Sequence, residues 1–202
     1  MKPQITTQPR EELRKTLLAA RRALTAEQVA AWSQRLLEHL LRVFPQPPGK
    51  RIAFYAPIQN EPDLRPAAAL WREQGATTLL PVVIAPRAPL IFRPWTPDTP
   101  LVPDRYGIPT PNEGAEMTPD VVIMTLNAFD ARGYRLGYGG GFFDRTLAAL
   151  QPRPLVLGVG FEMGRVESIQ PEAHDQAVDW VLTEAGAWAV GRSGNSQIVG
   201  LY

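Results

Sequence analysis

The sequence predicts an α/β fold, a single domain in which a mostly parallel central sheet carries helices on both faces and is preceded by a pair of N-terminal helices. Short apolar runs alternate with segments of helical periodicity, the pattern of strand–helix–strand units. The 202 residues suit one domain, and neither an internal repeat nor a linker interrupts them. We expect the domain to cover residues 10–184, with tails at 1–9 and 185–202.

The N-terminal region indicates two helices, both expected to pack against the sheet. At about 100° per residue, Leu13, Leu17 and Leu24 fall within about 40° of one another and form one apolar stripe. Thr25 and Gln28 have the spacing of a capping box, so a second helix should begin at Ala26. Its expected buried face is Val29, Trp32, Leu36, Leu40 and Val43, and prolines from Pro45 onward end it.

The remaining elements follow from apolar runs and turn residues. We expect buried strands at 51–56, 77–84, 120–124, 154–159 and 180–183, an antiparallel strand at 90–95, and helices at 63–74 and 142–150. Asp63 is the expected cap of the helix at 63–74. Residues 96–119 contain too many prolines for regular structure and should lie on the surface, and the segment from Gly186 should be weakly structured.

Composition excludes several classes of chemistry. Twenty-one Lys and Arg against 20 Asp and Glu give a net charge of +1, so no overall field favours nucleic acid or an anionic membrane. No cysteine and only two histidines exclude disulfides, thiolate chemistry and multi-histidine metal sites. No run is apolar enough to span a membrane and residues 1–10 do not resemble a signal peptide, so we expect a cytoplasmic protein, a monomer or weak homo-oligomer.

A glycine-rich loop at residues 126–141 is the predicted ligand site. Glycines at 137, 139, 140 and 141 precede a helix start, where free backbone amides suit phosphate. The loop lacks the Lys of a Walker A motif, and Phe142 replaces the third glycine of a dinucleotide fingerprint. A tight turn without a ligand is the alternative. Arg135, a phosphate-binding side chain, and Asp144, a magnesium ligand or merely a helix-dipole partner, favour a phosphate site.

Three arginines of the first helix lie on one side of it. Arg10, Arg14 and Arg21 fall at about 0°, 40° and 20° on the helical wheel, beside the leucine stripe. Together they predict an anion site. The alternative is that their stems pack while their charged heads reach water or the acidic side chains of Glu11 and Glu12.

These motifs resemble a known family. The run from Ala128 to Arg145 is similar to the signature of 5-formyltetrahydrofolate cyclo-ligases, and further matches extend the resemblance over residues 10–184. They are Arg14 with Arg22, Gln59-x-Glu61, Tyr106-Gly-Ile-Pro-x-Pro111, and His174-Asp-x-x-Val-Asp179-x-Val-x-Thr-Glu184. The resemblance implies ATP- and Mg²⁺-dependent closure of 5-formyltetrahydrofolate to 5,10-methenyltetrahydrofolate, with reduced folate and ATP as the small-molecule partners.

The resemblance also implies roles for individual residues. Catalysis would fall to Arg135 and Asp144, and magnesium to Asp144 and Asp179. ATP would contact Arg10, Arg14, Arg135, Leu136, Gly137, Tyr138, Gly139, Gly140, Gly141, Phe142 and Phe143. Folate would contact Glu61, Tyr106, Gly139, Gly140, Gly141 and Phe142. For Glu61 the alternative is a helix cap, for the aromatic residues packing, and for Asp179 a surface carboxylate at a strand start.

The chain departs from the family pattern at a few positions, and two other functions stay open. Arg10 stands where lysine is common, Thr125 where proline is common, Gly140 where some members have lysine, and Phe143 where a tyrosine is frequent. One alternative is a phosphate-binding enzyme similar to sugar isomerases, which would need a base in the loop and no ATP. The other is a folate-binding module without catalysis.

Overall fold

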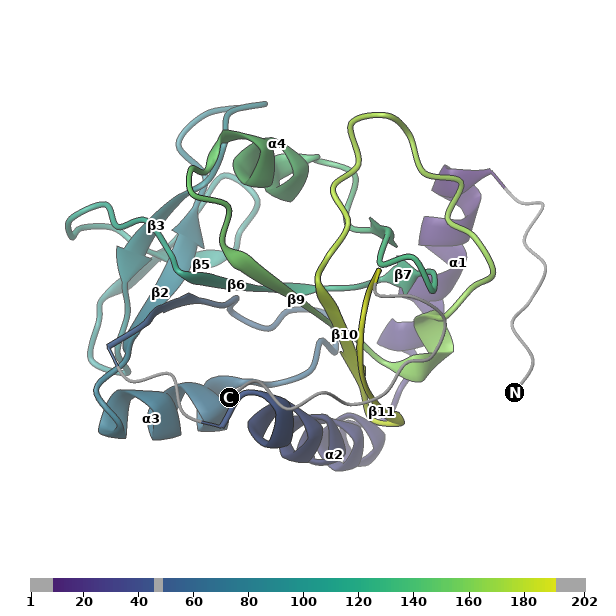
Figure 1. The fold of residues 1–202 in the computed structure, drawn as a ribbon, viewed down its shortest axis with the longest axis horizontal. Helices are drawn as coiled ribbons and strands as arrows, with labels where there is room; N and C mark the ends of the chain where they lie inside the picture. Colours follow the sequence, from purple (N-terminus) through teal and green to yellow (C-terminus); the bar gives the residue numbers. More distant parts are fainter. Residues whose placement is uncertain (1–8, 46–48, 192–202) are drawn as a thin grey trace.

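A seven-stranded sheet runs through the centre of the computed structural model, which describes residues 9–45 and 49–191 (Figure 1). The strand order is β11-β10-β9-β6-β1-β2-β3. The inner strands pair in parallel, and β3 and β11 add antiparallel edges. The strands are β1 (Arg51–Ala53), β2 (Thr77–Val82), β3 (Ile91–Pro94), β6 (Val121–Thr125), β9 (Leu155–Val159), β10 (Trp180–Thr183) and β11 (Gly186–Ala189). The mostly parallel sheet is as predicted.

Helices cover both faces of this sheet, which confirms the predicted class. α2 (Ala26–Val43) and α3 (Arg65–Glu73) lie on one face, and α4 (Phe142–Ala149) lies on the other (Figure 1). Leu36, Leu40 and Trp71 join the core of the first face. Leu147 of α4 joins the core of the second. The capping box at Thr25 forms as predicted, and α2 begins at Ala26.

The first helix, α1 (Arg10–Arg22), does not pack on the central sheet, so the expectation of two sheet-packed helices is wrong for α1. Its leucine stripe instead covers a small antiparallel sheet of β7 (Ala128–Phe129) and β8 (Arg135–Leu136). Leu13 packs there with Ala128, Leu136 and Ile169. The helix α1 packs there because the first half of the glycine-rich loop folds into the β7–β8 hairpin, whose apolar face has to be buried. Figure 1 shows α1 beside β7, away from α2.

Two segments are more regular than the sequence predicts. The proline-rich segment contains a hairpin of β4 (Leu101–Pro103) and β5 (Pro109–Pro111), because its prolines occupy strand ends while Val102 and Thr110 pair at its centre. The segment from Gly186 forms β11, which pairs with β10 along its whole length, so weak structure is wrong for residues 186–189. Residues 1–8 and 192–202 of the expected tails lie outside the described residues.

Two smaller features complete the fold. A short 3-10 helix, η1 (Glu162–Gly164), follows β9. Within residues 9–45 and 49–191, no helix has the length and apolar character needed to cross a membrane.

Candidate active site

A cavity of about 630 Å³ opens beyond the carboxyl ends of β1 and β6. These strands are neighbours in the sheet, yet the chain leaves them in opposite directions, through α3 to β2 and through α4 to β9. Such a reversal of strand order is where open α/β sheets bind ligands. The lining comes from the start of α1, the loop after β1, the β4–β5 turn, residues 172–175 and the glycine loop. The glycine loop therefore reaches the pocket that the sequence predicted for it.

The glycine loop, residues 137–141, forms one wall of the pocket and leads into α4. Gly139 and Gly141 have φ values of 92° and 62°, which side chains rarely adopt. A Cβ on Gly141 would also meet the Arg145 guanidinium at 2.8 Å, and that guanidinium donates to the Gly140 carbonyl. Glycine is thus required at this turn, which presents the first turn of α4 to the pocket.

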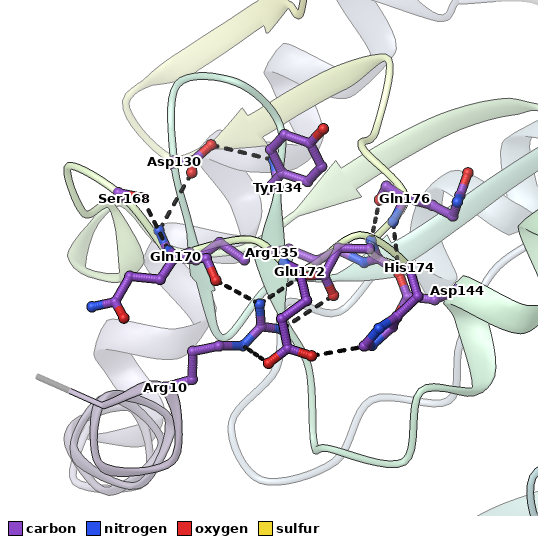
Figure 2. A network of polar contacts seen from close by, with 12 residues as sticks. Arg10, Asp130, Tyr134, Arg135, Asp144, Ser168, Gln170, Glu172, His174 and Gln176 are labelled. Carbon is purple, nitrogen blue, oxygen red and sulfur yellow. Dashed lines mark hydrogen bonds and ion pairs between the residues drawn. The ribbon is translucent and has the colours of Figure 1, made fainter.

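Three arginines reach the pocket from two directions. Arg10 extends from the start of α1 towards residues 170–176, where it donates to both carboxylate oxygens of Asp175 and to the Gln170 carbonyl (Figure 2). Arg14 donates to the Gly137 carbonyl over 2.9 Å. Arg135, buried on β8, donates to the Gln176 carbonyl and pairs with Asp144. Arg10 and Arg14 of the predicted anion site thus both line the pocket, whereas Arg21, its third arginine, does not.

The ion pair between Arg10 and Asp175 also affects the charge of the Asp175 carboxylate. Burial by itself would raise the pKa of Asp175, but the hydrogen bonds from Arg10 outweigh it and hold the pKa below its usual value. Asp175 is therefore an anion at neutral pH that keeps Arg10 at the pocket wall.

The two carboxylates proposed for magnesium are not brought together. Asp144 lies in the first turn of α4, lines the pocket, and accepts from Arg135 Nη2 and from the Gln176 N–H, each over 3.0 Å. Asp179 precedes β10, at the amino end of the strands, and does not line the cavity. It binds Arg153 and accepts from the Val156 N–H over 2.7 Å. The metal role suggested for Asp179 is corrected to a structural one.

Glu61 is a buried carboxylate on the other side of the pocket, with 4% of its surface exposed. It accepts from the Ile58 N–H over 2.9 Å and from the Tyr138 hydroxyl over 2.7 Å. Burial raises the pKa of Glu61, and the charge of Arg21 at 3.7 Å opposes that rise. The N-cap of α3 is Leu64, so neither Glu61 nor the expected Asp63 occupies that position, although Asp63 accepts from the Arg65 N–H.

Two aromatic rings stand beside the glycine loop. The rings of Tyr106 and Phe142 meet edge to face with their centroids 5.8 Å apart, and both line the cavity. Tyr106 remains 56% exposed. An exposed ring on a pocket wall is available to a flat heterocycle, so packing alone does not account for Tyr106.

The residues that the sequence predicts for ATP and folate lie together in the structure, but sequence reasoning misses some residues that hold them in place. Every residue predicted to contact ATP or folate lines the cavity. Arg21 does not, because it lies about 16 Å further along α1 than Arg10. Sequence reasoning also does not identify Asn127, which binds Arg21, or the pocket residues Tyr55 and Asp175. The motif that contains His174 could have indicated Asp175, whereas nothing local distinguishes Asn127.

Comparison with known proteins agrees with this geometry. The profile of the 5-formyltetrahydrofolate cyclo-ligase family matches residues 6–184. The 5-formyltetrahydrofolate cyclo-ligase of Haemophilus influenzae is 32% identical over 85% of this chain and 95% of its own length. The enzyme of the same name from Escherichia coli K12 is 33% identical over 83% of this chain and 96% of its own.

A solved structure shares the fold as well as the sequence pattern. The NMR structure of Aquifex aeolicus 5,10-methenyltetrahydrofolate synthetase superimposes with a TM-score of 0.77 and 29% identity, covering 93% of this chain and 95% of that one. A family profile that spans most of the chain, relatives of matching length and a shared fold lead to one conclusion: this chain belongs to the 5-formyltetrahydrofolate cyclo-ligase family.

Proposed function

We propose that this protein closes 5-formyltetrahydrofolate to 5,10-methenyltetrahydrofolate, using ATP and Mg²⁺ and releasing ADP and phosphate. The observation that carries the proposal is the composition of the single cavity described above. The glycine loop and the three arginines of this cavity suit a polyphosphate. The buried carboxylate and the two aromatic rings of the same cavity suit a heterocycle with N–H donors. Family membership supports the same pairing of substrates.

The residues present fit ATP. Arg10, Arg14 and Arg135 supply charged donors for phosphate oxygens, and the first turn of α4 supplies the positive end of a helix dipole. The glycine loop, with the neighbouring residues Leu136 to Phe143, would then enclose the nucleotide.

The residues present also fit magnesium, with Asp144 as the protein ligand. Mg²⁺ commonly takes one or two carboxylates and completes its shell with water and substrate phosphate oxygens. Among the described residues, no group of three or more His, Asp or Glu side chains is arranged to hold a metal ion by itself. When bound, the ion would neutralise charge on the transferring phosphoryl group.

Folate would occupy the Glu61 side of the pocket. The Glu61 carboxylate would accept hydrogen bonds from pterin N–H groups, and Tyr106 and Phe142 would flank the ring system. Burial strengthens such hydrogen bonds, because water does not compete for the carboxylate.

The reaction then requires positioning and charge neutralisation rather than a protein nucleophile. The formyl oxygen attacks the γ-phosphorus and ADP leaves, which turns a poor leaving group into a phosphate ester. N10 attacks the activated carbon, phosphate departs with the electrons of the C–O bond, and the N10 proton is lost. Arg14 and Arg135 would stabilise the charge on the phosphoryl oxygens, and the loop would hold both substrates in line.

The direct test mixes the protein with 5-formyltetrahydrofolate, ATP and Mg²⁺ and follows the near-ultraviolet absorbance of the methenyl product. We expect product only when all three are present, and none after chelation of the metal. A phosphate-dependent isomerase or a folate-binding module would give no methenyl band. Product formed without ATP would contradict the proposed activation step.

Arg14→Ala should raise the KM for ATP by roughly 10- to 100-fold, the usual effect of losing one charged hydrogen-bond donor. The KM for folate should change much less, because Arg14 lies against Gly139 and the Gly137 carbonyl. Lys15→Ala is the matched control, since Lys15 is an exposed cation on the same helix. Equal changes in both constants, or a lower melting temperature with unchanged kinetics, would place Arg14 outside the nucleotide site.

A further inference from the structure

A buried guanidinium lies behind the pocket wall. Arg21, in the last turn of α1, is only 4% exposed. Its Nε donates to the Gln59 carbonyl over 3.0 Å, one terminal nitrogen donates to Asn127 Oδ1, and the other donates to the Tyr138 hydroxyl. These partners come from the loop after β1, the segment after β6 and the glycine loop. Arg21 therefore ties together the three segments that meet at the reversal of strand order.

Its neighbour provides a contrast on the same helix. Arg22 is exposed, and both of its bonds go to one side-chain oxygen of Gln59, over 3.0 and 2.7 Å. Arg22 thus binds the same loop without reaching Glu61 or the glycine loop, which makes it a natural control.

The contacts of Arg21 lead to Glu61. The Tyr138 hydroxyl accepts from Arg21 and donates to Glu61 Oε1 over 2.7 Å, while Arg21 Nη2 lies 3.7 Å from the same oxygen. Both charged side chains are about 95% buried or more. A buried carboxylate without a cation is strongly destabilised, and the charge of Arg21 opposes the effect of burial on the pKa of Glu61.

We propose that Arg21 is a positioning residue for the folate side of the pocket: its guanidinium holds the Glu61 carboxylate and the Tyr138 hydroxyl in one arrangement and thereby docks the glycine loop on the loop after β1. This inference rests on the proposed function, because it takes the folate as the ligand of Glu61. Arg21 acts through Glu61 and does not itself line the cavity.

The arrangement has a consequence for pH dependence. Glu61 is faced by Arg21 from α1, Tyr138 from the glycine loop and Tyr55 from the loop after β1, with Asp63 beyond Tyr55. Burial raises the pKa values of both tyrosines, so neither ionises near neutrality. Without Arg21, the pKa of Glu61 rises further, and the carboxylate gains a proton as the pH falls. Folate affinity should then weaken towards acidic pH.

The experiment measures the KM for 5-formyltetrahydrofolate at saturating ATP and at pH 6, 7 and 8.5. For Arg21→Met we expect a rise of roughly 10-fold at pH 7, larger at pH 6 and smaller at pH 8.5, with a much smaller change in the KM for ATP. Arg21→Lys should restore much of the pH profile, since it keeps the charge, while its KM stays raised because one ammonium cannot replace the guanidinium fork. Arg22→Met should keep the wild-type pH profile. An Arg21→Met profile that matches Arg22→Met overturns the proposal.

Two further measurements keep the proposal testable if Arg21→Met does not fold or turnover is absent. Tyr138 as a whole residue is 42% exposed. The variant Tyr138→Phe removes the hydroxyl that lies between Arg21 and Glu61, and it should also raise the KM for folate. An unchanged constant overturns the proposal. Where turnover is absent, ¹³C NMR titration of the ligand-free protein should give a higher pKa for Glu61 in Arg21→Met than in Arg21→Lys or wild type, and equal values in all three overturn the proposal. Failure of the wild type to form the methenyl product instead refutes the proposed function.

Discussion

Asp144→Asn should lower kcat by on the order of 10²-fold and raise the Mg²⁺ concentration needed for half-maximal rate. The amide keeps the shape of the side chain and loses the anionic ligand. It also loses the ion pair in which Arg135 Nη2 lies 3.0 Å from Asp144 Oδ1, so a proposed phosphate-binding arginine is released at the same time. The amide oxygen can still accept from the Gln176 N–H, which should preserve the fold. Turnover measured against Mg²⁺ concentration gives both effects.

The matched control for this variant is Asp179→Asn. Asp179 pairs with Arg153 and accepts from the Val156 N–H outside the cavity, so we expect a lower melting temperature and an unchanged Mg²⁺ dependence. If Asp179→Asn shifts the Mg²⁺ dependence while Asp144→Asn does not, the assignment of the metal ligand is reversed.

Glu61→Gln should raise the KM for 5-formyltetrahydrofolate by at least about 10-fold and leave the KM for ATP near its wild-type value. The carboxylate accepts from the Ile58 N–H through one oxygen and from the Tyr138 hydroxyl through the other. An amide has only one acceptor oxygen, so either a protein donor or a pterin donor loses its partner. Steady-state kinetics with each substrate varied in turn separates the two constants.

The control for Glu61→Gln is a variant that loses one negative charge at an exposed position instead of the buried one. Glu172 lines the same cavity with a side chain that is 56% exposed, and it lies 3.7 Å from Arg10 and 3.6 Å from His174. Glu172→Gln should leave the KM for folate almost unchanged. If Glu61→Gln has normal folate affinity and only a lower melting temperature, the carboxylate serves the fold alone.

Local signals account for the parts of the fold that the sequence predicted well. The apolar runs before and after residue 130 became β6 and β9, because a strand buried on both faces needs little beyond a short apolar segment. Thr25 marked the start of α2, because a capping box is complete within four residues. The glycine loop could be predicted as a ligand site because the glycines that free its backbone and the start of the following helix are adjacent in the chain.

Two features that sequence reasoning missed are local hairpins. The strand β11 pairs with β10, which it follows after two residues, and the turn of the β4–β5 hairpin closes when Asp104 accepts the backbone N–H groups of Tyr106 and Ile108. The other missed features depend on contacts between distant parts of the chain. Asp179 matched a family motif, but only the packed sheet shows that it lies at the amino end of β10. Helical periodicity places Arg21 beside the leucine stripe, but only the folded structure shows that its guanidinium is buried against Asn127 and Tyr138.

The position of α1 has a consequence for how the protein is made. This helix is synthesised before the other described elements, yet two of its apolar partners, Val166 and Ile169, are added more than 140 residues after its last residue. Its polar partners, Gly137 and Asp175, also come late. While β1, β2 and β6 are already available to pair, α1 has no surface to bind.

The substrate pocket should accordingly be the last feature of the molecule to form during synthesis, because long-range contacts complete it. A nascent chain that ends before residue 166 would contain the central strands β1, β2, β6 and β9 and the glycine loop, but α1 would lack Val166, Ile169 and Asp175. Its arginines would then not be held at the pocket. Catalytic competence would thus depend on nearly complete translation.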